Sequence, residues 1–256
     1  MKILVTIGRG GTGKTSFVAL MTKYFIEIGE TPLLLVDADP DQNLGEMVGV
    51  DLAENGKKSI SEILVETFLE QGGTTVGVAP TERIESKIWT HSMYEGEHFD
   101  FIALGTKWVE GCYCLPNAAL KGALTSLTKN YKYVLIDSPA GLEHLNRRIT
   151  SKVNDIFDII DPSKKSFDHV ERVSRIAKEV KIEFENFYVV GGFRFPEELQ
   201  SYAEKEVIFK YIGKIARDEK VEKYVLAGES LLNLPEDCLA YVSVKNLLEK
   251  AGYAKK

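Results

Sequence analysis

Gly8-Arg9-Gly10-Gly11-Thr12-Gly13-Lys14-Thr15 fits the pattern G-x-x-x-x-G-K-[ST]. The apolar run Lys2–Ile7 before it predicts a buried strand, and the segment Lys14–Ile28 predicts a helix. Glycines let successive backbone N–H groups curl around a phosphate, and the start of the helix presents its positive dipole end to the same anion. Lys14 adds a full charge for the outer phosphates, and the Thr15 hydroxyl is a ligand for Mg²⁺. We therefore expect a nucleotide to be held by Gly8, Arg9, Gly10, Gly11, Thr12, Gly13, Lys14, Thr15 and Ser16.

Short apolar runs alternate with longer helical segments over the rest of the chain. Strands are predicted at Lys2–Ile7, Pro32–Asp37, Phe99–Leu104, Tyr133–Asp137, Asp155–Ile160, Phe187–Gly191 and Val207–Ile212. Helices are predicted at Lys14–Ile28, Asn117–Asn130, His169–Lys181 and Glu236–Ala251. Apolar runs without strict alternation are typical of strands buried on both faces, and strand–helix–strand repetition gives right-handed crossovers. We expect an α/β fold of the P-loop NTPase type, a mostly parallel twisted sheet with helices on both faces.

Composition narrows the class of protein. The 256 residues are 44% hydrophobic and 27% charged, which is typical of a soluble globular protein and excludes a disordered chain or a small disulfide scaffold. The formal net charge of −6 argues against a nucleic-acid partner. No run approaches the length of a membrane helix, and the short apolar start lacks a signal-peptide pattern, so we expect a cytoplasmic protein without stable membrane association. We expect residues 1–256 to form one domain, with a helical excursion around 51–98.

Asp137 is the first candidate ligand for a metal bound with the nucleotide. It ends the predicted strand Tyr133–Asp137, and ligands of open α/β sheets bind at the carboxyl ends of strands. We therefore expect Asp137 and Thr15 to organise Mg²⁺. Gly141 follows shortly after and is expected to move with the γ-phosphate, as switch segments do.

Asp37 and Asp39 leave the second predicted strand two residues apart and therefore point to the same side. Asp39 is the candidate to orient the attacking water, and Pro40 fixes a rigid turn beside it. For Asp37, a role as a helix cap or turn residue is an equally good interpretation.

Gly8–Ser16, Asp39-Pro40 and Asp137–Gly141 together resemble the deviant-Walker-A ATPases. That family includes MinD and ParA, the arsenical and tail-anchored-protein ATPases, the nitrogenase iron protein and the Mrp iron–sulfur carriers. The resemblance implies a homodimer that holds ATP between its subunits and hydrolyses it to ADP. It also implies a loop lysine that reaches the partner's phosphates. Arg9 occupies that position and keeps the charge. Gly191 occupies the position of a family asparagine that reads adenine.

Glu110-Gly111-Cys112-Tyr113-Cys114, with the segment 141–145, resembles the CooC family, the maturation ATPases of nickel carbon monoxide dehydrogenase. A homologue serving acetyl-CoA synthase is equally compatible. The resemblance implies that the Cys-x-Cys pair binds a metal, nickel, at the dimer interface and that the client is a nickel enzyme.

The thiol chemistry is consistent with shared binding. One cysteine pair cannot complete a four-coordinate site, whereas two copies of Cys112 and Cys114 about a two-fold axis supply four thiolates. Thiolates suit Zn²⁺, Cu(I) or Ni²⁺ and disfavour Mg²⁺, and only the resemblance selects nickel. The structural alternative is a pair of buried cysteines or a disulfide across one residue. Cys238 is predicted to be core filler.

The sequence thus predicts a slow ATP-hydrolysing metallochaperone in which Lys14, Asp39 and Arg9 are catalytic. Its expected cofactors are ATP/ADP, Mg²⁺ and Ni²⁺ or Zn²⁺, and its expected partners are a second copy of the chain and a client nickel enzyme. Three alternatives stay open. They are a MinD- or ParA-like positioning scaffold, a non-hydrolysing nucleotide sensor suggested by Arg9 and Gly191, and a small-molecule kinase on the same scaffold.

Overall fold

A computed structural model describes residues 1–66, 85–105, 114–139, 150 and 152–255, with only the backbone described for 114–119. Its described strands form one eight-stranded sheet in the order β3-β4-β2-β5-β1-β6-β7-β8, in which only β3 is antiparallel to its neighbour. The strands are β1 (Lys2–Gly8), β2 (Leu33–Asp37), β3 (Tyr94–Glu95), β4 (Phe99–Ala103), β5 (Tyr133–Asp137), β6 (Lys152–Ile160), β7 (Glu183–Gly191) and β8 (Lys210–Lys214). The prediction of a mostly parallel α/β sheet is confirmed.

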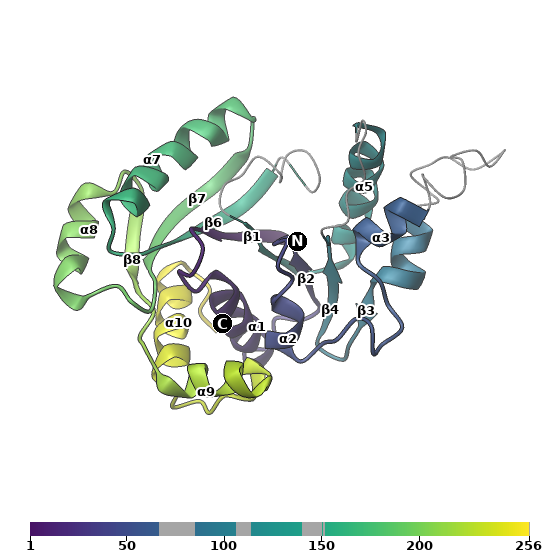
Figure 1. Ribbon diagram of the computed structural model, residues 1–256. Helices are drawn as coiled ribbons and strands as arrows, with labels where there is room; N and C mark the ends of the chain where they lie inside the picture. Colours follow the sequence, from purple (N-terminus) through teal and green to yellow (C-terminus); the bar gives the residue numbers. More distant parts are fainter. Residues whose placement is uncertain (67–84, 106–113, 140–149, 151, 256) are drawn as a thin grey trace.

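Helices cover both faces of this sheet (Figure 1). The α-helices are α1 (Lys14–Glu27), α2 (Leu44–Val48), α3 (Ile60–Val65), α5 (Cys114–Leu127), α7 (Lys164–Glu179), α8 (Gln200–Glu206), α9 (Glu219–Ala227) and α10 (Leu239–Lys250). Single turns of other helix types are η2 (Ile88–Ser92), η3 (Thr128–Asn130), η4 (Glu197–Leu199) and η5 (Leu231–Asn233). None of the helices that the structure describes has both the length and the apolar character to span a bilayer.

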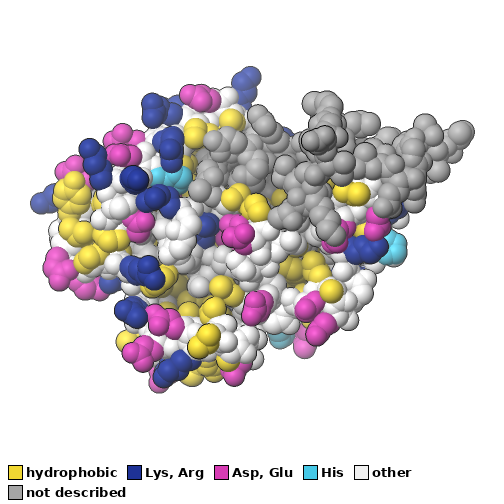
Figure 2. All heavy atoms as spheres, viewed as in Figure 1, with side chains coloured by type: hydrophobic (Ala, Val, Ile, Leu, Met, Phe, Trp, Pro, Cys, Tyr) yellow, Lys and Arg dark blue, Asp and Glu magenta, His cyan; other side chains and the backbone are white. Residues whose placement is uncertain are grey.

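The apolar side chains divide into two cores, one on each face of the sheet. The core on one face joins β-strand residues such as Leu4 and Leu135 to α1, α2 and α10. The core on the other face joins Val5 and Ile136 to α3, α5, α7 and α8. This division follows from the side-chain alternation of strands, because residues one apart point to opposite faces. On the face shown in Figure 2, acidic and basic side chains are interspersed over α7 and α8.

Most element boundaries agree with the sequence pattern, and the differences have local causes. The strand predicted at Val207–Ile212 begins only at Lys210, because the N–H of Val207 bonds the carbonyl of Ala203 and closes α8. The helix α7 begins earlier than predicted, because the Ser163 side chain accepts the N–H of Ser166 and caps it. The short elements α2, α8, α9 and β3 are not predicted by the pattern.

The segment 51–98 contains the predicted helical structure and one strand. The helices α3 and η2 lie within it, and its end forms β3, which pairs with β4 at the sheet edge. Residues 67–84 lie outside the described part of the chain. The single-domain organisation stays a prediction.

The chain leaving β7 lies directly against the phosphate loop. A Cβ on Gly192 would lie 2.4 Å from the carbonyl oxygen of Thr12, whereas a Cβ on Gly10 would meet nothing within 4 Å. Only glycine allows this approach of two backbone segments without displacement.

Gly192→Ala is therefore expected to lower the free energy of unfolding by about 1–3 kcal/mol, because backbone atoms cannot yield to a methyl group. Gly10→Ala is expected to leave it unchanged or to raise it by up to about 1 kcal/mol, since alanine restricts the unfolded chain. Urea denaturation without nucleotide measures both. Equal stabilities of the two variants would contradict the close approach.

Candidate functional site

The loop between β1 and α1 has the backbone geometry of an anion-binding turn. Gly8, Gly11 and Gly13 adopt positive φ values of 141°, 76° and 96°. Gly13 precedes α1 in the left-handed conformation, and neither a side-chain cap nor an acidic residue occupies the first turn of the helix. The N–H groups and the positive dipole end of α1 are thus available for a phosphate.

Lys14 lies over this loop and is largely buried. Its side chain is 8% exposed, with Nζ 3.4 Å from the Arg9 carbonyl oxygen and 3.9 Å from Oδ2 of Asp39. The Thr12 hydroxyl donates to the same Arg9 carbonyl at 2.9 Å. The structure therefore brings together Lys14, Asp39 and the loop, as the sequence predicts. Their catalytic roles stay predictions.

Asp37 and Asp137 are register partners at the ends of β2 and β5, and both are fully buried. Asp37 accepts the N–H of Asp39 at 3.1 Å and the N–H of Leu44 at 2.9 Å. Burial and the charge of Asp137 raise the pKa of Asp37 to about 8. Asp37 thus fixes the turn that carries Asp39 and the start of α2, which agrees with the cap interpretation.

The carboxylate of Asp137, unlike that of Asp37, accepts no hydrogen bond from a described residue. Neither of its carboxylate oxygens has a partner with hydrogen-bond geometry among the described residues. Burial raises its pKa to about 6, while the nearby Thr15 hydroxyl and the charge of Lys14 limit the rise. A buried carboxylate with free lone pairs beside a hydroxyl suits a hard divalent cation such as Mg²⁺. These residues therefore fit the predicted Mg²⁺ ligands, and on binding the ion would supply positive charge for the phosphates.

Arg9 is held by residues of the same chain. Its Nη1 donates to the Ser163 hydroxyl at 3.1 Å and lies 3.4 Å from Oδ2 of Asp161. Burial opposes ionisation of Asp161, but hydrogen bonds from Ser163 and Ser166 and the charge of Arg9 lower its pKa below the usual value. The sequence reasoning missed Asp161 and Ser163. Their signal is the Asp-Pro-Ser segment after a strand, typical of a helix start.

An apolar cavity of about 380 Å³ opens beside the loop at Gly13 and Ser16. Its walls come from α1, α9 and the chain after β7 and β8, and include Phe193, Ile215 and Val221. The sequence reasoning did not find this cavity, and only the aromatic Phe193 directly after two glycines hinted at it.

Gly191 has no room for a larger side chain. A Cβ at this position would lie 2.8 Å from the Phe195 ring and 2.9 Å from the Cβ of Lys214. The packing of Phe195 therefore leaves no room here for the asparagine that the resembled family has at this position.

The predicted thiol site falls outside what the structure describes. Cys112 and Gly141 are not among the described residues, and Cys114 is described only as the first backbone position of α5. Among the described residues there is no cluster of three metal-ligating side chains. Cys238 is a buried free thiol, as predicted.

Asp158 is a further buried carboxylate, which the sequence reasoning missed. It lies in β6, is fully buried, and its Oδ1 is 3.8 Å from Nε2 of the buried His169 of α7. Nη2 of Arg172 lies 3.2 Å from the other ring nitrogen of His169. Burial raises the pKa of Asp158 to about 7, and the charge of Lys14 opposes the rise. The signal was a charged residue inside the apolar run of β6.

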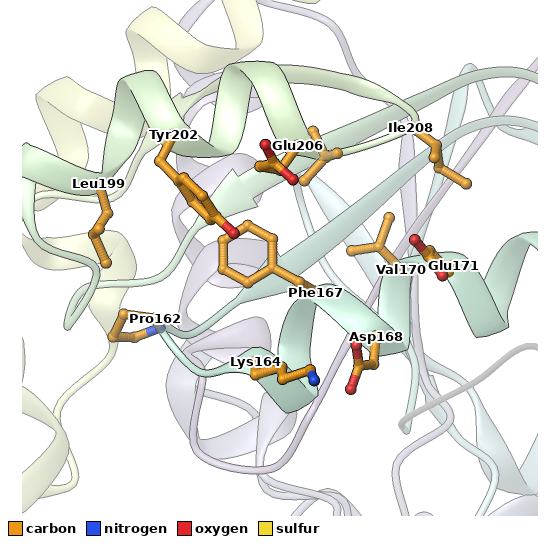
Figure 3. Close-up of a pocket in the computed structure, with 11 residues that line it drawn as sticks. Pro162, Lys164, Phe167, Asp168, Val170, Glu171, Leu199, Tyr202, Glu206 and Ile208 are labelled. Atoms are coloured by element: carbon orange, nitrogen blue, oxygen red, sulfur yellow. The ribbon is translucent and has the colours of Figure 1, made fainter.

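A second hollow lies away from the phosphate loop, between α7 and α8 (Figure 3). Its volume is about 440 Å³, and Phe167 and Tyr202 line it together with the charged Lys164 and Asp168. It contains none of the predicted site residues, so the loop edge of the sheet is the better candidate for catalysis.

Comparison with known proteins gives the family. Residues 1–188 match the family model described as an AAA domain. An ATP-binding protein of Methanocaldococcus jannaschii is 34% identical over 252 residues, which cover 97% of each chain. The chain therefore belongs to this family of AAA-domain proteins.

Three further proteins are similar to this chain. The carbon monoxide dehydrogenase accessory protein CooC of Rhodospirillum rubrum is 27% identical over 264 residues, with 98% of both chains covered. The structure of MinD from Pyrococcus horikoshii, complexed with Mg-ADP, has a TM-score of 0.68 at 21% identity and covers 98% of this chain and 95% of that one. A ParA family ATPase from Chlorobium tepidum gives the same TM-score at 15% identity, with 96% of each chain covered. These two structures share the fold of this chain.

The raised pKa of Asp158 predicts a pH-dependent stability. Between about pH 4 and pH 7 the unfolded chain loses this proton while the folded chain keeps it, so the free energy of unfolding falls as pH rises through this window. Asp158→Asn should remove up to about 4 kcal/mol of that fall. Urea denaturation at several pH values measures it.

Asp168→Asn is the control, because Asp168 is an exposed carboxylate adjacent to His169 in the chain. It should keep the pH dependence of the wild type. If Asp158→Asn also keeps the pH dependence of the wild type, the pKa of Asp158 is not raised in the folded protein.

Proposed function

We propose that the chain is a homodimeric ATPase that binds nickel or zinc through Cys112 and Cys114 and delivers the metal to a nickel enzyme such as carbon monoxide dehydrogenase or acetyl-CoA synthase. The observation that carries the proposal is one chain holding both a phosphate loop, with an unpartnered buried Asp137 beside it, and a Cys-x-Cys pair. The similarity to CooC along 98% of the chain supports it. We also infer that residues 1–256 form a single domain, which the one continuous sheet supports.

In this proposal the loop amides and Lys14 bind the phosphates, and Thr15 and Asp137 hold Mg²⁺, which neutralises phosphate charge. Asp39 orients a water whose oxygen bonds to the γ-phosphorus while the bond to the β–γ bridging oxygen breaks, giving ADP and phosphate. Its position 3.9 Å from Lys14 supports this role. Gly141 moves with the γ-phosphate when the nucleotide is hydrolysed.

Arg9 reaches the partner's phosphates in the proposed dimer, and its hold on Ser163 and Asp161 must then be released. The cavity beside Gly13 would take the nucleotide base, because it is apolar and adjoins the loop. Nucleotide and thiol sites at one interface would be coupled reciprocally, so ATP would assemble a four-thiolate site and ADP would loosen it.

Hydrolysis tests the catalytic half of the proposal. Asp39→Asn should lower the ATPase kcat by about 100-fold or more and leave ATP affinity nearly unchanged, because the water loses its partner. Lys14→Ala should weaken ATP binding itself, since it removes a charge from the phosphates. Phosphate release and equilibrium ATP binding measure the two effects.

Asp41→Asn provides the matched control, because Asp41 is an exposed carboxylate of the same turn. It should behave like the wild type. Turnover that survives Asp39→Asn at the wild-type rate would remove Asp39 from the mechanism.

Metal content tests the thiol half. Purified wild type should bind one nickel or zinc ion per two chains, and Cys112→Ala or Cys114→Ala should reduce this content about 10-fold or more, because each removes two of four thiolates. Elemental analysis with and without ATP gives the stoichiometry. Cys238→Ala, which removes a buried core thiol, should retain the metal. Equal metal content in all variants would end this half of the proposal.

A MinD- or ParA-like scaffold is the second candidate, favoured by the shared fold with those ATPases. It would use ATP to dimerise on a surface. ATP-dependent binding to anionic vesicles or DNA that is indifferent to Cys112 and Cys114 would select it.

A further inference from the structure

The Thr6 side chain is buried, and its hydroxyl is not needed for packing. Thr6 lies on β1, is 1% exposed, and its hydroxyl oxygen has no hydrogen-bond partner among the described residues. Valine has the same shape and would fill the same volume without leaving a hydroxyl unpartnered. The hydroxyl therefore needs another explanation.

Thr6 is the register partner of Asp137 on the neighbouring strand β5. Register partners of parallel strands point to the same face, and Thr6 and Asp137 share the face of Leu4 and Leu135, on which α1 packs. Both side chains thus point toward the helix that begins at Lys14. Three unpartnered buried oxygens, one from Thr6 and two from Asp137, meet on this face.

Burial alone does not explain the missing hydrogen bonds, because the neighbouring carboxylate of Asp37 is equally buried and has its partners. Asp37, the register partner of Asp137 on β2, has both oxygens bonded to backbone N–H groups. Of the three register partners Asp37, Asp137 and Thr6, only Asp137 and Thr6 have side-chain oxygens without a hydrogen-bond partner among the described residues. A shared ligand that offers both donors and acceptors, such as a water molecule, would satisfy the pair.

We propose that Thr6 is a positioning residue for Mg²⁺: its hydroxyl and Asp137 together hold a water ligand of the ion that accompanies the nucleotide. This inference rests on the nucleotide site proposed above. Thr6 acts through Asp137 and the water and does not contact the phosphates. Partners of this kind orient metal ligands, and their loss typically weakens metal binding about 10-fold or more.

The test is isothermal titration of the full chain with ADP in EDTA and across a series of Mg²⁺ concentrations. Thr6→Val should lower the apparent affinity for Mg²⁺ about 10-fold in the presence of ADP and leave ADP affinity in EDTA unchanged. Thr6→Ser keeps the hydroxyl and should restore Mg²⁺ affinity. The melting temperature of nucleotide-free Thr6→Val should equal or exceed that of the wild type, because an unpartnered hydroxyl has been removed.

Thr22→Val is the matched control. Thr22 is fully buried on α1, and its hydroxyl donates to the Val18 carbonyl at 2.9 Å, so its loss should not alter the Mg²⁺ dependence. Wild-type Mg²⁺ affinity in Thr6→Val, or an equal loss of ADP affinity in EDTA, would overturn the proposal. If Thr6→Val does not fold, comparison of Thr6→Ala with Thr6→Ser decides the question by the same criteria. If the wild type binds ADP with the same affinity with and without Mg²⁺, only this inference is overturned. If it binds no nucleotide at all, the proposed nucleotide site is overturned as well.

Discussion

Parallel pairing of β1 with β5 and of β5 with β2 is the constraint on which the site depends. It places Thr6, Asp137 and Asp37 in one row at the carboxyl edge of the sheet, on the face covered by α1. A shift of one residue in either pairing would turn a carboxylate to the opposite face and replace it with an apolar side chain. The hydrophobic cores on the two faces therefore fix the chemistry of the edge, because they fix the register.

The same edge concentrates buried charge. Lys14 faces the carboxylates, and burial raises the pKa values of Asp37 and Asp137 toward neutrality. One of these carboxylates is satisfied by backbone N–H groups and orders the turn of Asp39, while the other keeps free lone pairs. Two aspartates on adjacent strands thus differ in their hydrogen bonds, which agrees with the separate interpretations that their sequence contexts favour.

The sheet, its strand ends and the phosphate loop were predictable because local patterns encode them. Contacts between segments that are distant in the chain were not predictable. Asp161 and Ser163 hold Arg9 across more than one hundred and fifty positions, and no short pattern connects them. The exclusion of a side chain at Gly191 follows from the Phe195 ring, which only the folded chain brings there. Short elements such as α9, which has nine residues, were missed because they are shorter than the stretch over which a helical pattern can be read.

The helix α9 forms one wall of the cavity beside the loop, yet none of its residues is fully buried. Its attachments are the Asp218 cap, exposed ion pairs such as Lys220 with Asp237, and two partly buried side chains that pack against the core, Val221 and Tyr224. Exposed pairs contribute little, so Val221 and Tyr224 supply most of what holds this wall against the core. On the opposite wall the Phe193 ring lies so close to Gly13 that a Cβ at Gly13 would be 3.0 Å from it. The two sides of one cavity are thus formed in different ways, one by a tightly packed ring at the loop and the other by a helix with few buried side chains.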